Sequence, residues 1–220
     1  MASRLAHYAR ERISLFSWTS YSANLLHLIE KPECSYYTWS PELRLFGKWT
    51  EAQRLDGLDP ILDACAAKSV CDLGSGEGVI ARRLLDRGAA IVHGFERDLS
   101  RVSLANRICC DFEGTRFWQA DLSDWSAFEA QHAAHLRGAY DIVLYLGLHH
   151  HLPAAMRMLV LAGAANRTSE WLAVRTPTAL FRSDDIESVL NGLGFSLIAT
   201  NSKTASALGG SYLFRRQEHP

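Results

Sequence analysis

A short apolar strand that runs into a turn of alternating glycines is the feature that most constrains the fold. Residues 70–78 read Val-Cys-Asp-Leu-Gly-Ser-Gly-Glu-Gly and lead directly into a segment with helical spacing of apolar residues. Alternate glycines let the backbone turn tightly beside a ligand, and a helix N-terminus opens at Glu77. The D-x-G-x-G-x-G spacing differs from the G-x-G-x-x-G that seats a pyrophosphate. We interpret the turn as a nucleotide-type cofactor site, with an ordinary strand-to-helix turn as the alternative.

From Ser69 onward, short apolar strands alternate with helix-length amphipathic segments, which is the pattern of βαβ units. We therefore predict an α/β fold, with a doubly wound, mostly parallel sheet, helices on both faces and a C-terminal antiparallel strand. The strands are predicted at 69–73, 90–95, 115–119, 140–146, 170–175, 194–200 and 211–216. The helices are predicted at 77–87, 99–110, 124–135, 153–165 and 184–193.

Residues 1–60 show helical spacing without the alternation of a β-strand, for example in Leu5–Ile13 and Leu25–Ile29. A third helix is expected near Pro41. A fourth is expected near Thr50, where Thr50 and Gln53 have the spacing of a capping box, and it would end by Gly57 and Pro60. The chain is therefore divided into an N-terminal helical extension, 1–60, and an α/β domain, 61–220.

Charge and cysteine content narrow the range of partners. The formal net charge of −1 lacks the basic excess that neutralising nucleic-acid phosphates requires, so nucleic acid is an unlikely partner. The five cysteines include no C-x-x-C, so neither a disulfide framework nor a zinc site is indicated. No apolar run is long enough for a membrane span, and we expect a cytoplasmic protein without membrane insertion.

Two acids follow successive predicted strands at the edge where parallel sheets bind ligands. Glu96 stands eighteen residues after Gly78, close to the spacing at which a carboxylate accepts from ribose hydroxyls. Asp121 follows the next strand. Either acid alone has a helix cap or a solvated loop as its alternative. Together with the glycine turn they favour a bound nucleoside.

The segment after the strand at 140–146 reads Leu146-Gly-Leu-His-His-His-Leu-Pro153. With the glycine turn and the two acids, it resembles class I S-adenosylmethionine-dependent methyltransferases, in the family's order across residues 69–155. The resemblance implies S-adenosylmethionine (SAM) as the cofactor and S-adenosylhomocysteine (SAH) as the product. It also implies that Asp121 holds the adenine amino group and that residues 1–60 cover the cofactor as a lid. The expected cofactor-binding residues are Asp72, Gly74, Ser75, Gly76, Glu96, Arg97, Asp121, Leu122, Leu146 and Gly147.

The three consecutive histidines are the candidates for proton transfer. A histidine near its ordinary pKa accepts a proton close to neutral pH. His150 is our first candidate for a general base and His149 the second, with packing or backbone hydrogen bonding as the alternative role. Adjacent side chains seldom converge on one metal ion, and no further ligand stands at a suitable spacing, so no metal site is predicted.

Four further residues are expected to contact the substrate: Trp39, Trp49, His151 and Arg175. The two tryptophans belong to an aromatic-rich stretch whose alternative role is core packing. Arg175 follows a strand and could bind a carboxylate or phosphate through two hydrogen bonds, with a surface salt bridge as the alternative.

The acceptor is narrowed by motifs that this chain lacks. The segment directly after residue 146 contains no Asp/Asn-Pro-Pro-aromatic motif, no Pro-Cys and no acid. By the resemblance to the family, these absences disfavour base or glutamine amino groups, cytosine carbon and metal-bound catechols as acceptors. We therefore predict O-methylation of a small molecule or saccharide. The alternatives are an RNA methyltransferase using Arg82, Arg83, Arg87, Arg97, Arg101 and Arg107, a non-catalytic SAM-binding regulator, and a Rossmann dehydrogenase. The sequence leaves the oligomeric state open.

Overall fold

The computed structural model describes residues 37–201 and 208–217. Its contacts divide the chain into two compact units, Met1–Ser35 and Tyr36–Pro220, and every described residue belongs to the second. The helices expected at Leu5–Ile13 and Leu25–Ile29 lie outside the described residues. Within the described part of the chain, no helix has the length and apolarity needed to cross a membrane.

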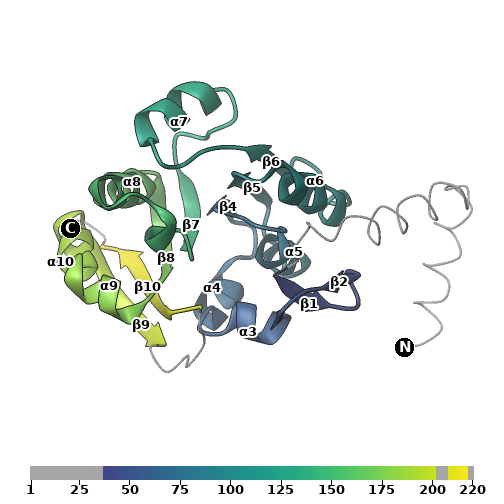
Figure 1. Ribbon diagram of the computed structural model, residues 1–220, viewed down its shortest axis with the longest axis horizontal. Helices are drawn as coiled ribbons and strands as arrows, with labels where there is room; N and C mark the ends of the chain where they lie inside the picture. Colours follow the sequence, from purple (N-terminus) through teal and green to yellow (C-terminus); the bar gives the residue numbers. More distant parts are fainter. Residues whose placement is uncertain (1–36, 202–207, 218–220) are drawn as a thin grey trace, which may run out of the picture. The chain divides into compact units, whose positions relative to one another are not determined.

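A seven-stranded sheet forms the centre of the second unit, in the order β6-β5-β4-β7-β8-β10-β9 (Figure 1). Neighbouring strands from β6 to β8 pair in parallel, and β10 runs antiparallel between β8 and β9. The order reverses between β4 and β7, which is where open α/β sheets bind ligands. The strands are β4 Ser69–Leu73, β5 Ile91–Glu96, β6 Arg116–Gln119, β7 Tyr140–Leu146, β8 Thr168–Thr176, β9 Phe195–Asn201 and β10 Gly210–Arg216.

Helices cover both faces of the sheet (Figure 1), and the sheet separates two buried apolar clusters. In β7, Ile142 and Leu144 belong to the cluster beneath α5 and α6, whereas Val143 and Tyr145 belong to the cluster beneath α7, α8 and α10. A strand that is apolar on both faces is what a central position in such a sheet requires. The helices are α5 Val79–Asp86, α6 Leu99–Ile108, α7 Trp125–His132, α8 Ala154–Asn166, α9 Thr178–Ser183 and α10 Ile186–Gly192.

The predicted fold class is confirmed, and most predicted elements fall within a few residues of the observed ones. The strand at 140–146 has the predicted bounds. From Ser69 onward, two short elements were not predicted: α9, and a 3₁₀ turn, η1, at His149–His151.

The helix expected near Pro41 is wrong. Residues 38–50 instead form a small sheet of three strands, β1 Thr38–Ser40, β2 Leu45–Phe46 and β3 Trp49–Thr50. Pro41 lies in the turn between β1 and β2, and Trp39 packs edge-on against its cross-strand neighbour Phe46. Such aromatic pairs stabilise antiparallel strands and override the weak helical spacing.

The predicted helix after Thr50 is confirmed, including its capping box. In α3, Glu51–Leu55, the Thr50 side chain accepts from the Gln53 amide, and the Gln53 side chain accepts from the Thr50 amide. Pro60 was expected to end this segment and does not. It lies in the first turn of the next helix, α4 Asp59–Ala64, where its missing amide proton costs nothing.

Candidate functional site

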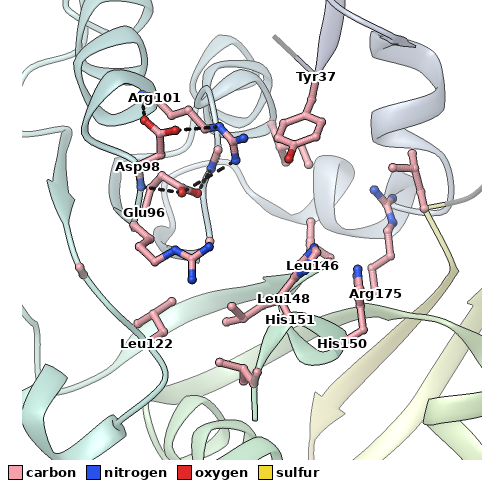
Figure 2. Close-up of a pocket in the computed structure, with 18 of the residues that line it drawn as sticks. Tyr37, Glu96, Asp98, Arg101, Leu122, Leu146, Leu148, His150, His151 and Arg175 are labelled. Atoms are coloured by element: carbon pink, nitrogen blue, oxygen red, sulfur yellow. Dashed lines mark hydrogen bonds and ion pairs between the residues drawn. The ribbon is translucent and has the colours of Figure 1, made fainter. Parts of the chain in front are cut away.

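A cavity of about 680 Å³ opens at the carboxyl ends of β4, β5, β6, β7 and β8 (Figure 2). Its volume is within the range of small-molecule sites. Glu96, Asp98 and Arg101 lie on one side, and His150, His151 and Arg175 lie on the other. Of the residues predicted to form the site, those that line the cavity are Trp49, Gly74, Gly76, Glu96, Arg97, Asp121, Leu122, Leu146, Gly147, His150, His151 and Arg175.

The glycine turn is shaped for close approach by a ligand. Gly74 and Gly76 have positive φ angles of 77° and 56°, and both line the cavity. Amides of Gly74 and Ser75 donate to the Phe95 carbonyl at 2.8 and 3.2 Å, which fixes the turn against β5. Ser75 itself is buried and does not line the cavity. Gly78 serves packing, because a Cβ there would lie 2.7 Å from the Ala105 Cβ of α6.

Glu96 connects the glycine turn to the end of β5. One carboxylate oxygen accepts from the Gly76 amide at 3.0 Å and the other from the Asp98 amide at 2.9 Å. The Arg101 Nη1 atom lies 4.0 Å from Glu96 Oε1, and Glu96 is 8% exposed. A carboxylate oxygen can accept two hydrogen bonds, so each Glu96 oxygen can accept one more from a group in the cavity.

Asp121 lies beyond Glu96, after β6. Its carboxylate accepts from the Ser123 amide at 2.9 Å, and this bond holds the pKa of Asp121 below its usual range. The group is therefore ionised at neutral pH and available as an acceptor. Arg97 and Leu122 line the same end of the cavity.

Asp72, at the end of β4, lies beneath the glycine turn and not on the cavity surface. It is 3% exposed, and its Oδ2 atom has no hydrogen-bond partner. Burial raises the pKa of Asp72 to about 7, with Glu96 adding to the effect and Arg54 opposing it. A buried acceptor without a partner is costly, so this carboxylate is suited to a cationic or hydrogen-bonding ligand group.

Arg54 and Tyr37 line the cavity and were not predicted as site residues. The Arg54 Nη2 atom lies 3.8 Å from where a Cβ on Gly76 would stand, and its buried Nε has no hydrogen-bond partner. The Tyr37 ring lies 4.2 Å beneath the Arg101 guanidinium. Nothing in the helical pattern around α3 distinguished Arg54 from a solvent-facing residue.

Glu77 explains how Tyr37 reaches the cavity. This carboxylate is 1% exposed and accepts from the Tyr37 amide and from the Thr38 hydroxyl. Glu77 thereby joins β1 to the glycine turn across forty residues of sequence. The aromatic density of residues 36–49 was the signal that could have pointed to Tyr37.

The histidines after β7 divide into two environments. His150 and His151 line the cavity, with ring centroids 4.0 Å apart. His150 has a buried Nδ1 atom without a partner. Burial lowers the pKa of His150, and the neighbouring histidines and Arg157 lower it further. His150 is therefore neutral at pH 7 and can accept a proton.

His149 is a correction to the prediction. It is fully buried and does not line the cavity. One ring nitrogen lies 3.1 Å from the Tyr145 hydroxyl and the other 2.9 Å from an Asp184 carboxylate oxygen. With both nitrogens engaged, His149 anchors the 3₁₀ turn and leaves His150 as the candidate base.

Two predicted substrate contacts also differ from expectation. Trp39 does not line the cavity; its side chain packs against Phe46 and is 47% exposed to solvent. Arg175 lines the cavity, but its guanidinium donates to the Ser211 hydroxyl and to the carbonyls of Arg54 and Asp56. Arg175 therefore binds protein groups rather than forming a surface salt bridge. The described residues contain no group of three or more histidine, cysteine or acidic side chains arranged to hold a metal.

No family model matches the sequence, and no curated protein sequence matches it closely. Solved structures do match. Magnesium protoporphyrin IX methyltransferase from Synechocystis PCC 6803, with bound SAM, is 20% identical with a TM-score of 0.59, over 76% of this chain and 79% of that one. The chain has the class I SAM-dependent methyltransferase fold.

Two further methyltransferase structures show the same fold. The N-methyltransferase NodS from Bradyrhizobium japonicum WM9 is 11% identical with a TM-score of 0.55, over 71% of this chain and 90% of that one. A TehB-like SAM-dependent methyltransferase from Corynebacterium glutamicum is 17% identical with a TM-score of 0.55, over 78% and 90%. Because different methyltransferases share this fold, the acceptor must be inferred from the cavity.

Proposed function

We propose that the protein is a SAM-dependent methyltransferase that O-methylates a hydroxyl of a small molecule or saccharide. The observation that carries the proposal is one cavity lined by the glycine turn, Glu96, Asp121 and His150, which come from four separate segments. Such convergence is what an adenosyl cofactor with an adjacent proton acceptor requires.

The polar groups of the cavity fit the parts of SAM. Glu96 would accept from the ribose hydroxyls, and Asp121 from the adenine amino group, with Arg97 and Leu122 beside it. At the other end, Arg54 would bind the carboxylate of the amino-acid portion. The negative charge of Asp72 beneath the turn would favour the ammonium group, although Asp72 does not itself line the cavity. Backbone of Gly74, Gly76, Leu146 and Gly147 would line the path between them.

The protein's contribution to the reaction is orientation and proton removal. When bound, SAM supplies a methyl group already activated by the sulfonium. His150, neutral because of burial, would take the proton of the acceptor hydroxyl as the O–C bond forms and the C–S bond breaks. Trp49, His151 and Leu148 would hold the acceptor. The lining acids Glu96, Asp98 and Asp121 lie at or just after the ends of β5 and β6. The described acceptor side therefore suits a neutral or anionic molecule.

The lid role of residues 1–60 is part of the proposal. It is supported by three lining residues that this segment contributes, Tyr37, Trp49 and Arg54.

An RNA acceptor gains little support from the arginines once considered for it. Arg82 and Arg83 pair with Asp86, and Arg83 also pairs with Glu51. Arg87 pairs with Asp63, and Arg101 lies near acids at the cavity. These acids offset much of the positive charge that phosphate binding would use.

The test is calorimetric titration of the full chain with SAM and SAH, followed by a screen of hydroxylated acceptors for SAH formation. The proposal predicts one cofactor site and turnover that His150→Ala lowers at least about 10²-fold and added RNA does not change. Binding without turnover on any acceptor would favour the regulatory module instead. No binding of either compound would refute the proposal.

A further inference from the structure

A buried arginine near the cavity donates only to groups of the protein. Arg175, at the end of β8, is 4% exposed. Its Nε donates to the Ser211 hydroxyl at 2.9 Å, Nη1 to the Arg54 carbonyl at 2.8 Å and Nη2 to the Asp56 carbonyl at 2.7 Å. These contacts join β8, β10 and the end of α3. The rigid planar fork of a guanidinium is suited to holding several acceptors at once.

The site is costly for a cation. Burial lowers the pKa of Arg175 to about 10, and the positive charge of Arg54 contributes. The hydrogen bonds go to neutral oxygens rather than to a carboxylate. An apolar side chain in this position would leave the hydroxyl and the two carbonyls without these hydrogen bonds.

The helix that Arg175 contacts, α3, has little packing of its own. α3 has five residues, and none of them is buried. Its N-terminal end is fixed by the Thr50–Gln53 capping box and by the ion pair between Glu51 and Arg83. Its C-terminal carbonyls have no partner within the helix, as at any helix end. Arg175 supplies partners at that end.

The loop after α3 is packed closely against the same two strands. A Cβ on Gly57 would lie 2.9 Å from the Asn201 Cβ and 3.0 Å from the Ser211 Cβ. The Asn201 side chain also donates to an Asp56 carboxylate oxygen at 2.8 Å. The backbone that carries Arg54 is therefore seated from the strand side, while the Arg54 side chain lines the cavity beside the glycine turn.

We propose that Arg175 is a positioning residue that holds the Arg54 guanidinium in place for the carboxylate of the cofactor's amino-acid portion. The proposal rests on the proposed function, and it assigns affinity for one end of the ligand to a residue that acts through Arg54. An anionic group on Arg54 would also offset the repulsion between the two arginines.

Two ligands separate positioning from general stability. SAH carries the amino-acid carboxylate, and 5′-methylthioadenosine shares the adenosine but lacks it. Arg54→Met and Arg175→Lys should each weaken SAH binding about tenfold, the usual effect of one charged hydrogen bond, and change methylthioadenosine binding less than twofold. The double variant should bind SAH no more weakly than Arg54→Met alone.

A matched control is available at the opposite end of the sheet. Arg216 donates to the carbonyls of Thr168, Ala165 and Leu193. Arg216→Met should lower the melting temperature and leave both affinities unchanged. If Arg175→Lys does not fold, Ser211→Ala removes one acceptor of Arg175 and should weaken SAH binding alone, by a few-fold.

Equal weakening of both ligands by Arg175→Lys or Ser211→Ala would overturn the proposal, as would a further loss of SAH affinity when Arg54 is already replaced. Those results leave the proposed function standing, because wild-type protein still binds SAH. Wild-type protein that binds neither SAM nor SAH refutes the proposed function and this inference together.

Discussion

The two sides of the cavity are built in different ways. On the proposed adenosine side, Glu96 ends β5 and Asp121 lies shortly after β6, and both accept from amides within a few residues of a strand end. The other part of the lining, Tyr37, Trp49 and Arg54, comes from a segment before the α/β domain. Glu77 accepts from the Tyr37 amide, and Arg175 donates to the Arg54 carbonyl. Local chain geometry determines the first side, and long-range contacts determine the second.

If this comparison is right, the largest single effect follows removal of the candidate base. His150→Ala should lower kcat about 10²- to 10³-fold, which is typical for loss of general base catalysis, and leave SAH affinity within twofold. His149→Ala should instead lower the melting temperature, because it breaks contacts with Tyr145 and Asp184. Steady-state kinetics and thermal melts of both variants check this. An unchanged kcat in His150→Ala would refute the role of His150 as general base.

The pH dependence of the same step sharpens the assignment. The proposed base is the neutral form of His150, and burial lowers the pKa of this residue below the usual value of about 6.5. Activity should therefore be retained at pH 6.5 and fall only as the pH decreases further. A kcat profile on the full chain, with stability checked at each pH, measures this. A decline that begins above pH 7 would contradict it.

On the adenosine side, loss of one carboxylate should lower the affinity for SAH about 10²-fold. Glu96→Ala would remove the proposed acceptor for two ribose hydroxyls and the brace on the Gly76 amide, at roughly 1.5 kcal/mol for each bond to a charged group. SAH affinity should fall by that factor, and methylthioadenosine affinity should fall equally. Calorimetry with both ligands checks this, and loss of SAH affinity alone would place Glu96 at the wrong end.

The two tryptophans give a smaller, paired test of the acceptor side. Trp49 lines the cavity and Trp39 does not. Trp49→Ala should raise the acceptor KM about tenfold through lost apolar contact and leave SAH affinity unchanged, whereas Trp39→Ala should change neither. Equal effects of the two substitutions would show that the small sheet acts as a whole.

The smallest expected effect is on stability. The folded-state pKa of Asp72 is raised from the usual 3.8 to about 7, so the folded protein binds more protons than the unfolded chain between these values. Without cofactor, stability should therefore fall as the pH rises from about 4 to 7. Asp72→Asn should remove about 1–3 kcal/mol of that decline. Urea unfolding at pH 5 and pH 8 checks this. An equal slope in both proteins would contradict it.

How far the sequence could predict the molecule follows the same division. The order of strands and helices from Ser69 and the residues after β4, β5 and β6 were predictable, because each depends on local periodicity and turn chemistry. Arg54 was not, because its place depends on Arg175, 121 positions away in the sequence. His149 and His150 are adjacent in sequence, and only the 3₁₀ turn sends one into the core and the other to the cavity.

The small sheet at residues 38–50 was mispredicted for a related reason. Leu45 is fully buried and its neighbour Phe46 is 63% exposed, which is a β-alternation too short to recognise in two- and three-residue strands. Pairing with a neighbouring strand, which the sequence does not display, decides such elements.

The most direct test of the central claim is calorimetric titration of the full chain with SAH and, separately, with NAD. The proposed cavity predicts one SAH site per chain, weakened about 10²-fold by Glu96→Ala, and no NAD binding. NAD binding without SAH binding, or SAH binding that Glu96→Ala leaves unchanged, would contradict the account.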